Sequence, residues 1–97
     1  MPHGDFEELN KLSQQKVFQL FSDEVYRFSE YDEQTRLLAA CEVNPLAVSL
    51  GVMSKSFGLA GLRIGWVATR DAEVLKRMAE LKDYTTICNS APSEYLA

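Results

Sequence analysis

Two charged side chains in this 97-residue sequence could act together, the carboxylate of Asp23 and the amine of Lys55. Each follows a short apolar run with the length of a buried strand, residues 17–21 and residues 47–53. A lysine that leaves an apolar stretch is expected to be partly desolvated, which favours the neutral amine required for Schiff-base chemistry. By residue type alone a solvated surface lysine is the plainer interpretation. If both runs are neighbouring parallel strands, the carboxylate and the amine share one crevice.

The elements that would position these residues predict an α/β architecture, in the order helix, strand, connection, strand, loop, strand, helix. Asp5 and Glu8 have the spacing of a capping box at the start of the first helix. Glu73 and Arg77 can pair one turn apart in the last helix. The expected helices span residues 5–15 and 71–84, and the expected strands span residues 17–21, 47–53 and 63–69.

The connections predict how the strands are joined. Residues 26–45 are irregular, with a short helical turn expected around residues 33–41 and ended by Pro45. A crossover of this length joins parallel strands, whereas the loop containing Gly58 and Gly61 brings the third strand back antiparallel. The fold class is therefore a partial three-layer α/β sheet with two parallel strands, a third antiparallel strand and flanking helices. A continuation of the first helix through residues 17–21 is the alternative.

Composition excludes several classes of protein. A net charge of −4 and a pI near 4.9 disfavour nucleic-acid binding. The longest uncharged stretch, residues 43–54, is well short of the roughly 20 apolar residues of a membrane span. Residues 1–5 contain neither the basic nor the apolar region of a secretory signal, so we expect none, and two cysteines are too few for a disulfide framework. We expect one structural unit over residues 1–97, located in the cytoplasm.

The segment Ser-Lys-Ser-Phe-Gly-Leu-Ala-Gly-Leu-Arg-Ile-Gly-Trp, residues 54–66, resembles the cofactor-lysine segment of a known family. That family is the class I/II aminotransferases, which are fold type I pyridoxal-phosphate enzymes. Ser-Asp-Glu-Val-Tyr, residues 22–26, is similar to the Asp-x-x-Tyr segment of the same family and lies the expected distance upstream. The resemblance extends over residues 5–97 and implies a piece of the large, cofactor-binding domain.

The resemblance implies a role for each matching residue. Lys55 would bind the aldehyde of pyridoxal 5'-phosphate as a Schiff base and then move a proton during catalysis. Asp23 would keep the pyridine nitrogen protonated, and Tyr26 would donate a hydrogen bond to the phenolic oxygen of the ring. Arg63 would hold the phosphate, as would the hydroxyl of Ser54. Ser56 is a weaker candidate for the same phosphate. The substrates implied are an amino acid and a 2-oxo acid, in a homo-oligomer.

Plainer interpretations exist for the residues that the resemblance singles out. Without the lysine segment, Asp23 is a turn residue or a helix cap, and Tyr26 packs its ring with the hydroxyl at the surface. Arg63 can be a charge at a strand edge, and Trp66 is more typical of a core. The remaining candidates, His3, Cys41 and Cys88, have no metal-ligand spacing, so no metal site is predicted.

Several features depart from the family pattern. Val52 stands where many relatives have a phosphate-binding serine, and residues 1–4 lack the asparagines of the corresponding family segment. The family's glycine-rich phosphate segment, its stacking aromatic ring and its substrate-binding arginine have no counterpart in these 97 residues. We therefore expect the isolated chain to be inactive. A sheet of three strands would also leave unprotected edges and uncovered helix faces, so we expect self-association or poor order. The alternatives are a noncatalytic binding or oligomerisation module, and a carbon–sulfur lyase or decarboxylase that uses the same cofactor.

Overall fold

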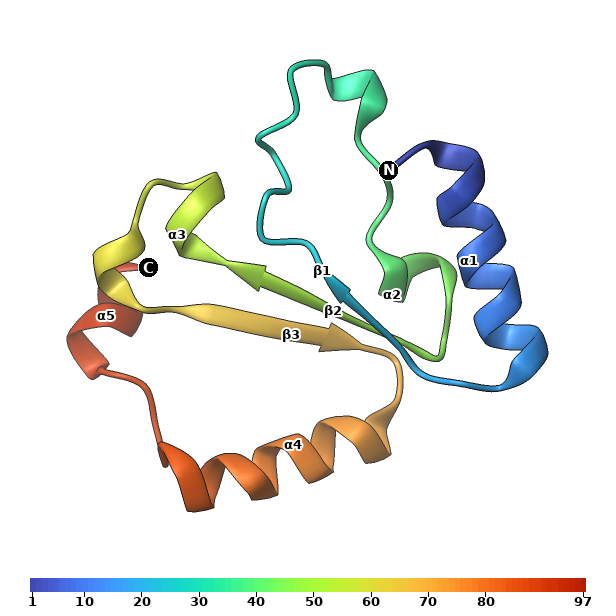
Figure 1. The fold of residues 1–97 in the computed structure, drawn as a ribbon. Helices are drawn as coiled ribbons and strands as arrows, with labels where there is room; N and C mark the ends of the chain where they lie inside the picture. Colours follow the sequence, from blue (N-terminus) through green and yellow to red (C-terminus); the bar gives the residue numbers. More distant parts are fainter.

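A three-stranded mixed sheet forms the middle of the structure, a computed structural model that describes residues 1–97 (Figure 1). The strands lie in the order β1-β2-β3, and the sheet confirms the predicted fold class. The elements in chain order are α1 (His3–Lys16), β1 (Leu20–Asp23), the 3-10 turn η1 (Glu33–Thr35), α2 (Ala40–Val43), β2 (Ala47–Val52), α3 (Met53–Ser56), the 3-10 turn η2 (Ala60–Leu62), β3 (Gly65–Thr69), α4 (Ala72–Thr85) and α5 (Ala91–Leu96).

The strand pairing places the ends of β1 and β2 at one edge of the sheet. β1 and β2 are parallel, with Asp23 opposite Leu50, and β2 and β3 are antiparallel, with Val52 opposite Gly65. The residue that ends β1 and the helix α3 that follows β2 therefore emerge in the same direction (Figure 1). This is the topology predicted for the crevice.

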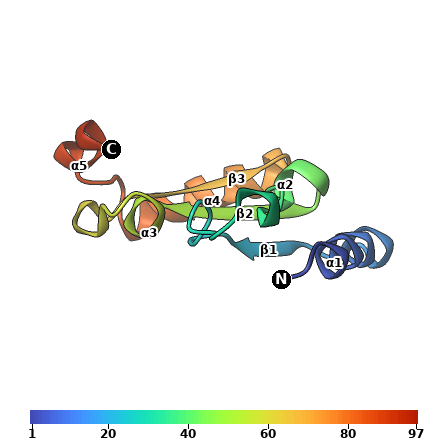
Figure 2. The same ribbon diagram turned by 90° about the horizontal axis from the view of Figure 1, so that it is seen from above.

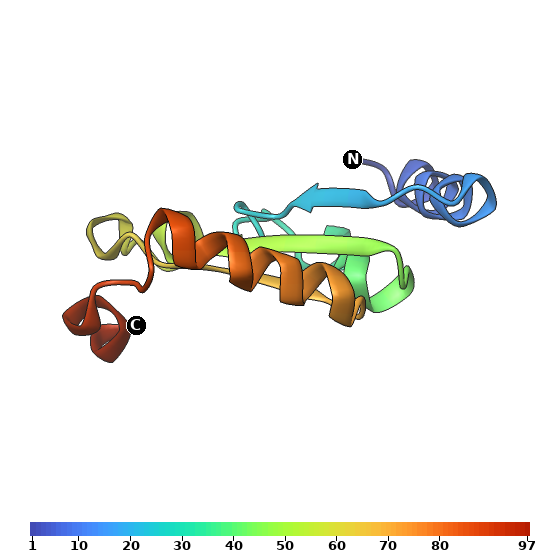
Figure 3. The same cartoon turned by 90° about the horizontal axis from the view of Figure 1, so that it is seen from below.

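The helices lie around the sheet, and the whole molecule is flat, with principal extents of 40 × 35 × 15 Å. Helix α4 runs alongside β3 in the opposite direction, and α1 lies beside the start of β1 (Figures 1 and 3). The view from above shows how thin this arrangement is, with α5 extending beyond the sheet (Figure 2). None of the helices combines the length and the apolar character that crossing a bilayer requires.

The buried interior is small. Its apolar members are Ala40, Ala47 and Val48. Large apolar side chains remain open to solvent, including Phe21 at 58% exposure and Leu81 at 64%. The apolar side chains of α4, such as Leu81, are therefore largely uncovered, which is typical of a surface that packs against further protein.

Buried polar groups join α1 to the connection before β2. Ser13 and Asn44 are fully buried, and the Asn44 side-chain amide donates to the Ser13 hydroxyl over 3.1 Å. Ser13 in turn donates to the Phe18 carbonyl oxygen over 2.7 Å. These hydrogen bonds satisfy groups that would otherwise be costly to bury.

The structure corrects the predicted start of the chain. Helix α1 begins at His3 after Pro2, which provides no side-chain cap, so the capping box of Asp5 and Glu8 is wrong. The strand predicted at residues 17–21 is displaced to Leu20–Asp23, because Val17 adopts a left-handed φ of 54° and ends the helix. A β-branched residue seldom takes that conformation, so the local pattern gave no sign of it.

The later boundaries are closer to prediction. The helical turn expected at residues 33–41 is split into η1 and α2, and α5 was not predicted. β3 begins at Gly65 because Arg63 has a left-handed φ of 55°. Helix α4 is confirmed: the Asp71 carboxylate accepts from the backbone N–H groups of residues 73 and 74, and Arg77 pairs with Glu73 over 3.0 Å.

Candidate active site

Asp23 is the last residue of β1 and directs the chain out of the sheet. Its Oδ1 accepts a hydrogen bond from the Val25 backbone N–H over 3.2 Å, which closes an Asx turn. The side chain is exposed and takes part in none of the ion pairs of the chain. Asp23 is therefore a turn residue, as the plainer interpretation held, whose second carboxylate oxygen stays available to a ligand.

Lys55 lies on the short helix α3 directly after β2 and meets the turn that follows β1. Its Nζ lies 5.9 Å from the centroid of the Tyr26 ring. The structure thus brings together two predicted site residues that come from the ends of different strands. Lys55 is exposed, so the expectation that it is partly desolvated is wrong for this chain. The apolar run ends at Val52, and α3 then carries the amine out of the sheet.

Ser54 and Arg63 occupy neighbouring turns. Ser54 is half-buried on α3, and Arg63 is exposed at the end of η2, which packs against α3. Neither Arg63 nor Lys55 forms an ion pair within the chain. Arg63 follows η2 on the adjoining loop, whereas Asp23, Tyr26, Ser54 and Lys55 come from the segments where β1 and β2 end.

Glu24 anchors the turn that carries Tyr26, a role that sequence reasoning missed. Its Oε1 accepts from the Ser49 hydroxyl over 2.8 Å and from the Ala40 backbone N–H over 2.9 Å. Its Oε2 lies 3.6 Å from Nη1 of Arg27, and this Nη1 also donates to the carbonyl oxygen of Leu37, before α2. A serine in the apolar run of β2 was the only signal that could have indicated a polar partner inside the sheet.

The turn continues into a strained residue held by aromatic and cationic groups. Phe28 has a φ of 71°, in the left-handed region that a bulky side chain rarely adopts. The guanidinium of Arg36 lies 4.7 Å from its ring centroid, and the Phe57 ring lies 6.2 Å away. Hydrogen bonding from its own backbone, and then from Arg36, holds the pKa of Glu30 below its ordinary value.

Two hollows flank this turn. One of about 360 Å³ is lined partly by Ser22, Asp23 and Tyr26, and the other, of about 240 Å³, partly by Ser56 and Trp66. Lys55 lines neither of them. Asp23 and Tyr26 thus line one hollow while Lys55 stands outside both, so the candidate residues do not share one enclosed pocket.

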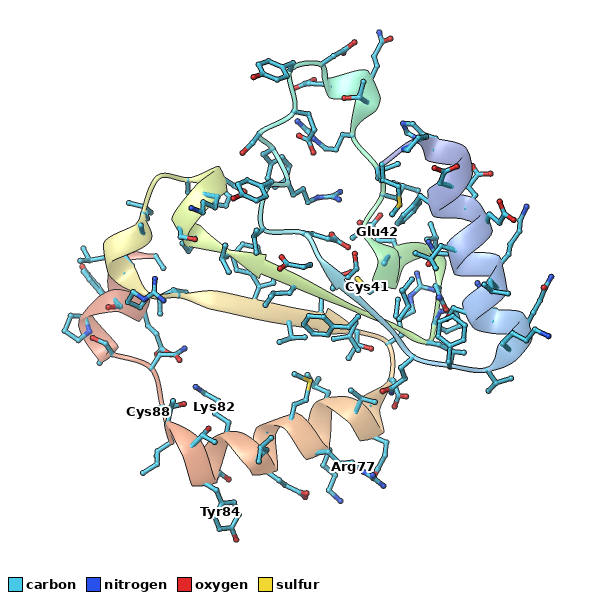
Figure 4. The ribbon with its side chains drawn as sticks, in the orientation of Figure 1. Cys41, Glu42, Arg77, Lys82, Tyr84 and Cys88 are labelled. Atoms are coloured by element: carbon cyan, nitrogen blue, oxygen red, sulfur yellow. The ribbon has the colours of Figure 1, made fainter.

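The two cysteines also have side chains that could react or bind a metal. Cys41 on α2 is half-buried and Cys88 beyond α4 is exposed, and both are free thiols. Figure 4 shows them far apart on different sides of the sheet. No group of three or more histidine, cysteine, aspartate or glutamate side chains could hold a metal ion.

The donor set fits pyridoxal phosphate by its chemistry. An exposed amine can bind an aldehyde, a free carboxylate can hold a protonated ring nitrogen, and a phenol can donate to a ring oxygen. An unpaired guanidinium and a hydroxyl can each bind a phosphate oxygen. The amine is that of Lys55, the carboxylate that of Asp23 and the phenol that of Tyr26. The guanidinium belongs to Arg63 and the hydroxyl to Ser54.

Comparison with known proteins gives the family. The family described as "Aminotransferase class I and II" matches residues 1–97. Curated relatives include the "Probable kynurenine–oxoglutarate transaminase BNA3" of Saccharomyces cerevisiae, 40% identical over 76 residues that cover 76% of this chain and 17% of that protein. An aspartate aminotransferase of Thermotoga maritima is 30% identical over 92 residues, covering 94% of this chain and 24% of that protein.

Solved structures agree with the sequence relatives. A pyridoxal-phosphate-dependent aminotransferase from Streptococcus suis superimposes with a TM-score of 0.87 at 30% identity, covering 99% of this chain and 25% of that one. A mutant of the Thermus thermophilus aspartate aminotransferase, complexed with tryptophan, gives a TM-score of 0.87 at 26% identity over 97% of this chain and 24% of that one. The chain spans a quarter or less of the length of these relatives. It belongs to the class I and II aminotransferase family.

Proposed function

We propose that the chain is part of the large, cofactor-binding domain of a pyridoxal-phosphate-dependent enzyme that transfers an amino group between an amino acid and a 2-oxo acid. The observation that carries this proposal is the placement of the Lys55 amine 5.9 Å from the Tyr26 ring, at the sheet edge where Asp23 ends β1. Relatives named as transaminases support the class of reaction.

Each site residue has a distinct part in binding the cofactor. Lys55 would hold the aldehyde carbon, and Asp23 would keep a proton on the ring nitrogen. Tyr26 would donate its hydroxyl proton to the ring oxygen, while Ser54 and Arg63 would bind the phosphate. When bound, pyridoxal phosphate supplies an electron sink and a carrier for the amino group.

Proton movement is the contribution of the lysine to the reaction. With the cofactor bound, the Lys55 amine would be the group placed to take a proton from the substrate and to return it during amino-group transfer. The short helix α3 and the ring of Tyr26 orient that amine. Because Lys55 is exposed here, exclusion of water from the amine would come from protein that covers this edge.

The uncovered apolar surface supports association with a second copy of the protein. Trp66 at 45% exposure and Leu75 at 48% add to an uncovered apolar surface on β3 and α4. We therefore propose that the protein is a homo-oligomer, which light scattering during size-exclusion chromatography tests. The free thiols support a reducing compartment, the cytoplasm.

The test is a titration of the purified chain with pyridoxal phosphate, followed by absorbance. We expect the wild-type chain to change the cofactor spectrum at saturation, and Lys55→Ala to lose that change. Lys76→Ala removes an amine from the exposed face of α4 and should leave the titration as in wild type. Equal spectra for all three chains would contradict the proposal and favour a noncatalytic module.

A further inference from the structure

Ser56 extends from the lysine-bearing helix α3 to the turn that follows β1. Its hydroxyl lies within hydrogen-bond distance of the Arg27 carbonyl oxygen and 3.4 Å from the Val25 carbonyl oxygen. A serine hydroxyl has one proton, so it donates to one of these acceptors at a time. The two carbonyls belong to the residues on either side of Tyr26.

This contact joins the immediate neighbours of two candidate site residues. Ser56 follows Lys55 on α3, and its acceptors flank Tyr26 in the turn. A displacement of the turn relative to α3 would therefore change the separation of the Lys55 amine and the Tyr26 ring. Half-burial of Ser56 shields the hydrogen bond from water, which makes it more effective than one at the surface.

The other anchors of the turn lead elsewhere. Glu24 ties the start of the turn to β2 and α2, through Ser49 and Ala40. The packing of Phe28 against Phe57 does connect the turn to the end of α3, but apolar contact is non-directional and fixes no register. The Ser56 hydroxyl is thus the directional link between the turn and the lysine helix.

We propose that Ser56 is a positioning residue, which sets the distance between Lys55 and Tyr26 through its hydrogen bond to the backbone beside Tyr26. The proposal rests on the proposed function of Lys55 as the cofactor-binding lysine, and it assigns to Ser56 a structural link in place of a phosphate contact.

The experiment compares variants that differ in the hydroxyl alone. Threonine and valine have nearly the same shape, so Ser56→Thr keeps the donor and Ser56→Val removes it, with Ser56→Ala as a smaller second deletion. Ser29→Ala removes an exposed hydroxyl from the same turn as a control. Each chain is studied by hydrogen–deuterium exchange of residues 24–29 without cofactor, and by the rate of borohydride-trapped attachment of pyridoxal phosphate to Lys55.

Loss of one hydrogen bond predicts roughly two- to tenfold faster exchange in the turn and a similar slowing of attachment at Lys55. We expect this for Ser56→Val and Ser56→Ala, and near wild-type behaviour for Ser56→Thr and Ser29→Ala. Circular dichroism reports whether each variant folds. If Ser56→Ala fails to fold, the comparison of Ser56→Thr with Ser56→Val tests the role of the hydroxyl.

Two results would overturn the inference, and they differ in what else they affect. Equal exchange and equal attachment for Ser56→Val and Ser56→Thr remove the role of Ser56 and leave the function of Lys55 intact. Absence of attachment at Lys55 in the wild-type chain refutes the proposed function, and the role of Ser56 falls with it.

Discussion

The carboxylate of Glu24 accepts a hydrogen bond from the Ser49 hydroxyl over 2.8 Å, and so ties the turn bearing Tyr26 to the middle strand of the sheet. The same oxygen accepts from the Ala40 backbone N–H over 2.9 Å. Ser49 and Ala40 are both buried, so each donor depends on this carboxylate for its partner. Asp23 and Tyr26 lie on either side of Glu24 along the turn and depend on the same anchor.

Removing this carboxylate should destabilise the chain. In Glu24→Ala the Ala40 N–H and the Ser49 hydroxyl lose their acceptor, which should lower the free energy of unfolding by about 1–3 kcal/mol. Glu24→Gln keeps an acceptor oxygen and should cost less. Urea denaturation followed by circular dichroism measures both. Glu80→Ala, on the exposed face of α4, serves as the control, and a loss there equal to that of Glu24→Ala would refute the anchoring role.

Gly51 is predicted to tolerate no larger side chain without movement of Trp66. A Cβ at position 51 would lie 2.4 Å from the indole ring of Trp66, its partner across β2 and β3. We expect Gly51→Ala to displace the indole, change its fluorescence and cost about 1–3 kcal/mol by overpacking. Trp66 is the single tryptophan, so the emission spectrum reports on this contact alone. Gly61→Ala, which meets nothing within 4 Å, should leave the spectrum unchanged.

Glu30 should make stability depend on acid pH. Its pKa is lowered in the folded chain by hydrogen bonding from its own backbone and from Arg36, so the ionised form is favoured by folding. The resulting stability is present above the unfolded pKa and is lost as the pH falls through the folded pKa. Glu30→Gln should therefore lower Tm at neutral pH and have less effect in acid. Thermal unfolding across this range tests it, with Glu8→Gln on the exposed side of α1 as control. A pH-independent difference would contradict the assignment.

The sheet and helix α4 could be predicted because their signals are local. The runs that became β2 and β3 are apolar and bounded by polar or glycine residues. For α4, the Asp71 cap and the pair of Glu73 and Arg77 act within one turn of helix, so sequence spacing alone indicates them.

Other features depend on residues that are distant in sequence. Apolar side chains recur every three residues in α1, at Phe6, Leu9 and Leu12, yet Leu12 is 43% exposed and Ser13 is buried. Ser13 is buried because Asn44 meets it from the connection before β2, a contact that no helical period contains. The anchoring role of Glu24 was missed for the same reason, since the donors that its carboxylate accepts from lie on α2 and β2, at Ala40 and Ser49.

The candidate site shows the same division. Asp23 and Lys55 could be placed at one edge because parallel strands end together, and the structure confirms that topology. The exposure of Lys55 agrees with the plainer interpretation by residue type. The expected desolvation was wrong, because the apolar run before Lys55 does not reveal that β2 stops at Val52 and that α3 carries the amine out of the sheet.

The most direct test of the account is to identify which lysine reacts with pyridoxal phosphate. The chain is incubated with a limiting amount of the cofactor and reduced with borohydride, and the modified peptides are then mapped by mass spectrometry. We expect the adduct to concentrate on Lys55 over Lys11, Lys16, Lys76 and Lys82, and to decline there in Asp23→Ala and Tyr26→Phe. An adduct spread evenly over these lysines would contradict the claim that this edge of the sheet is a cofactor site.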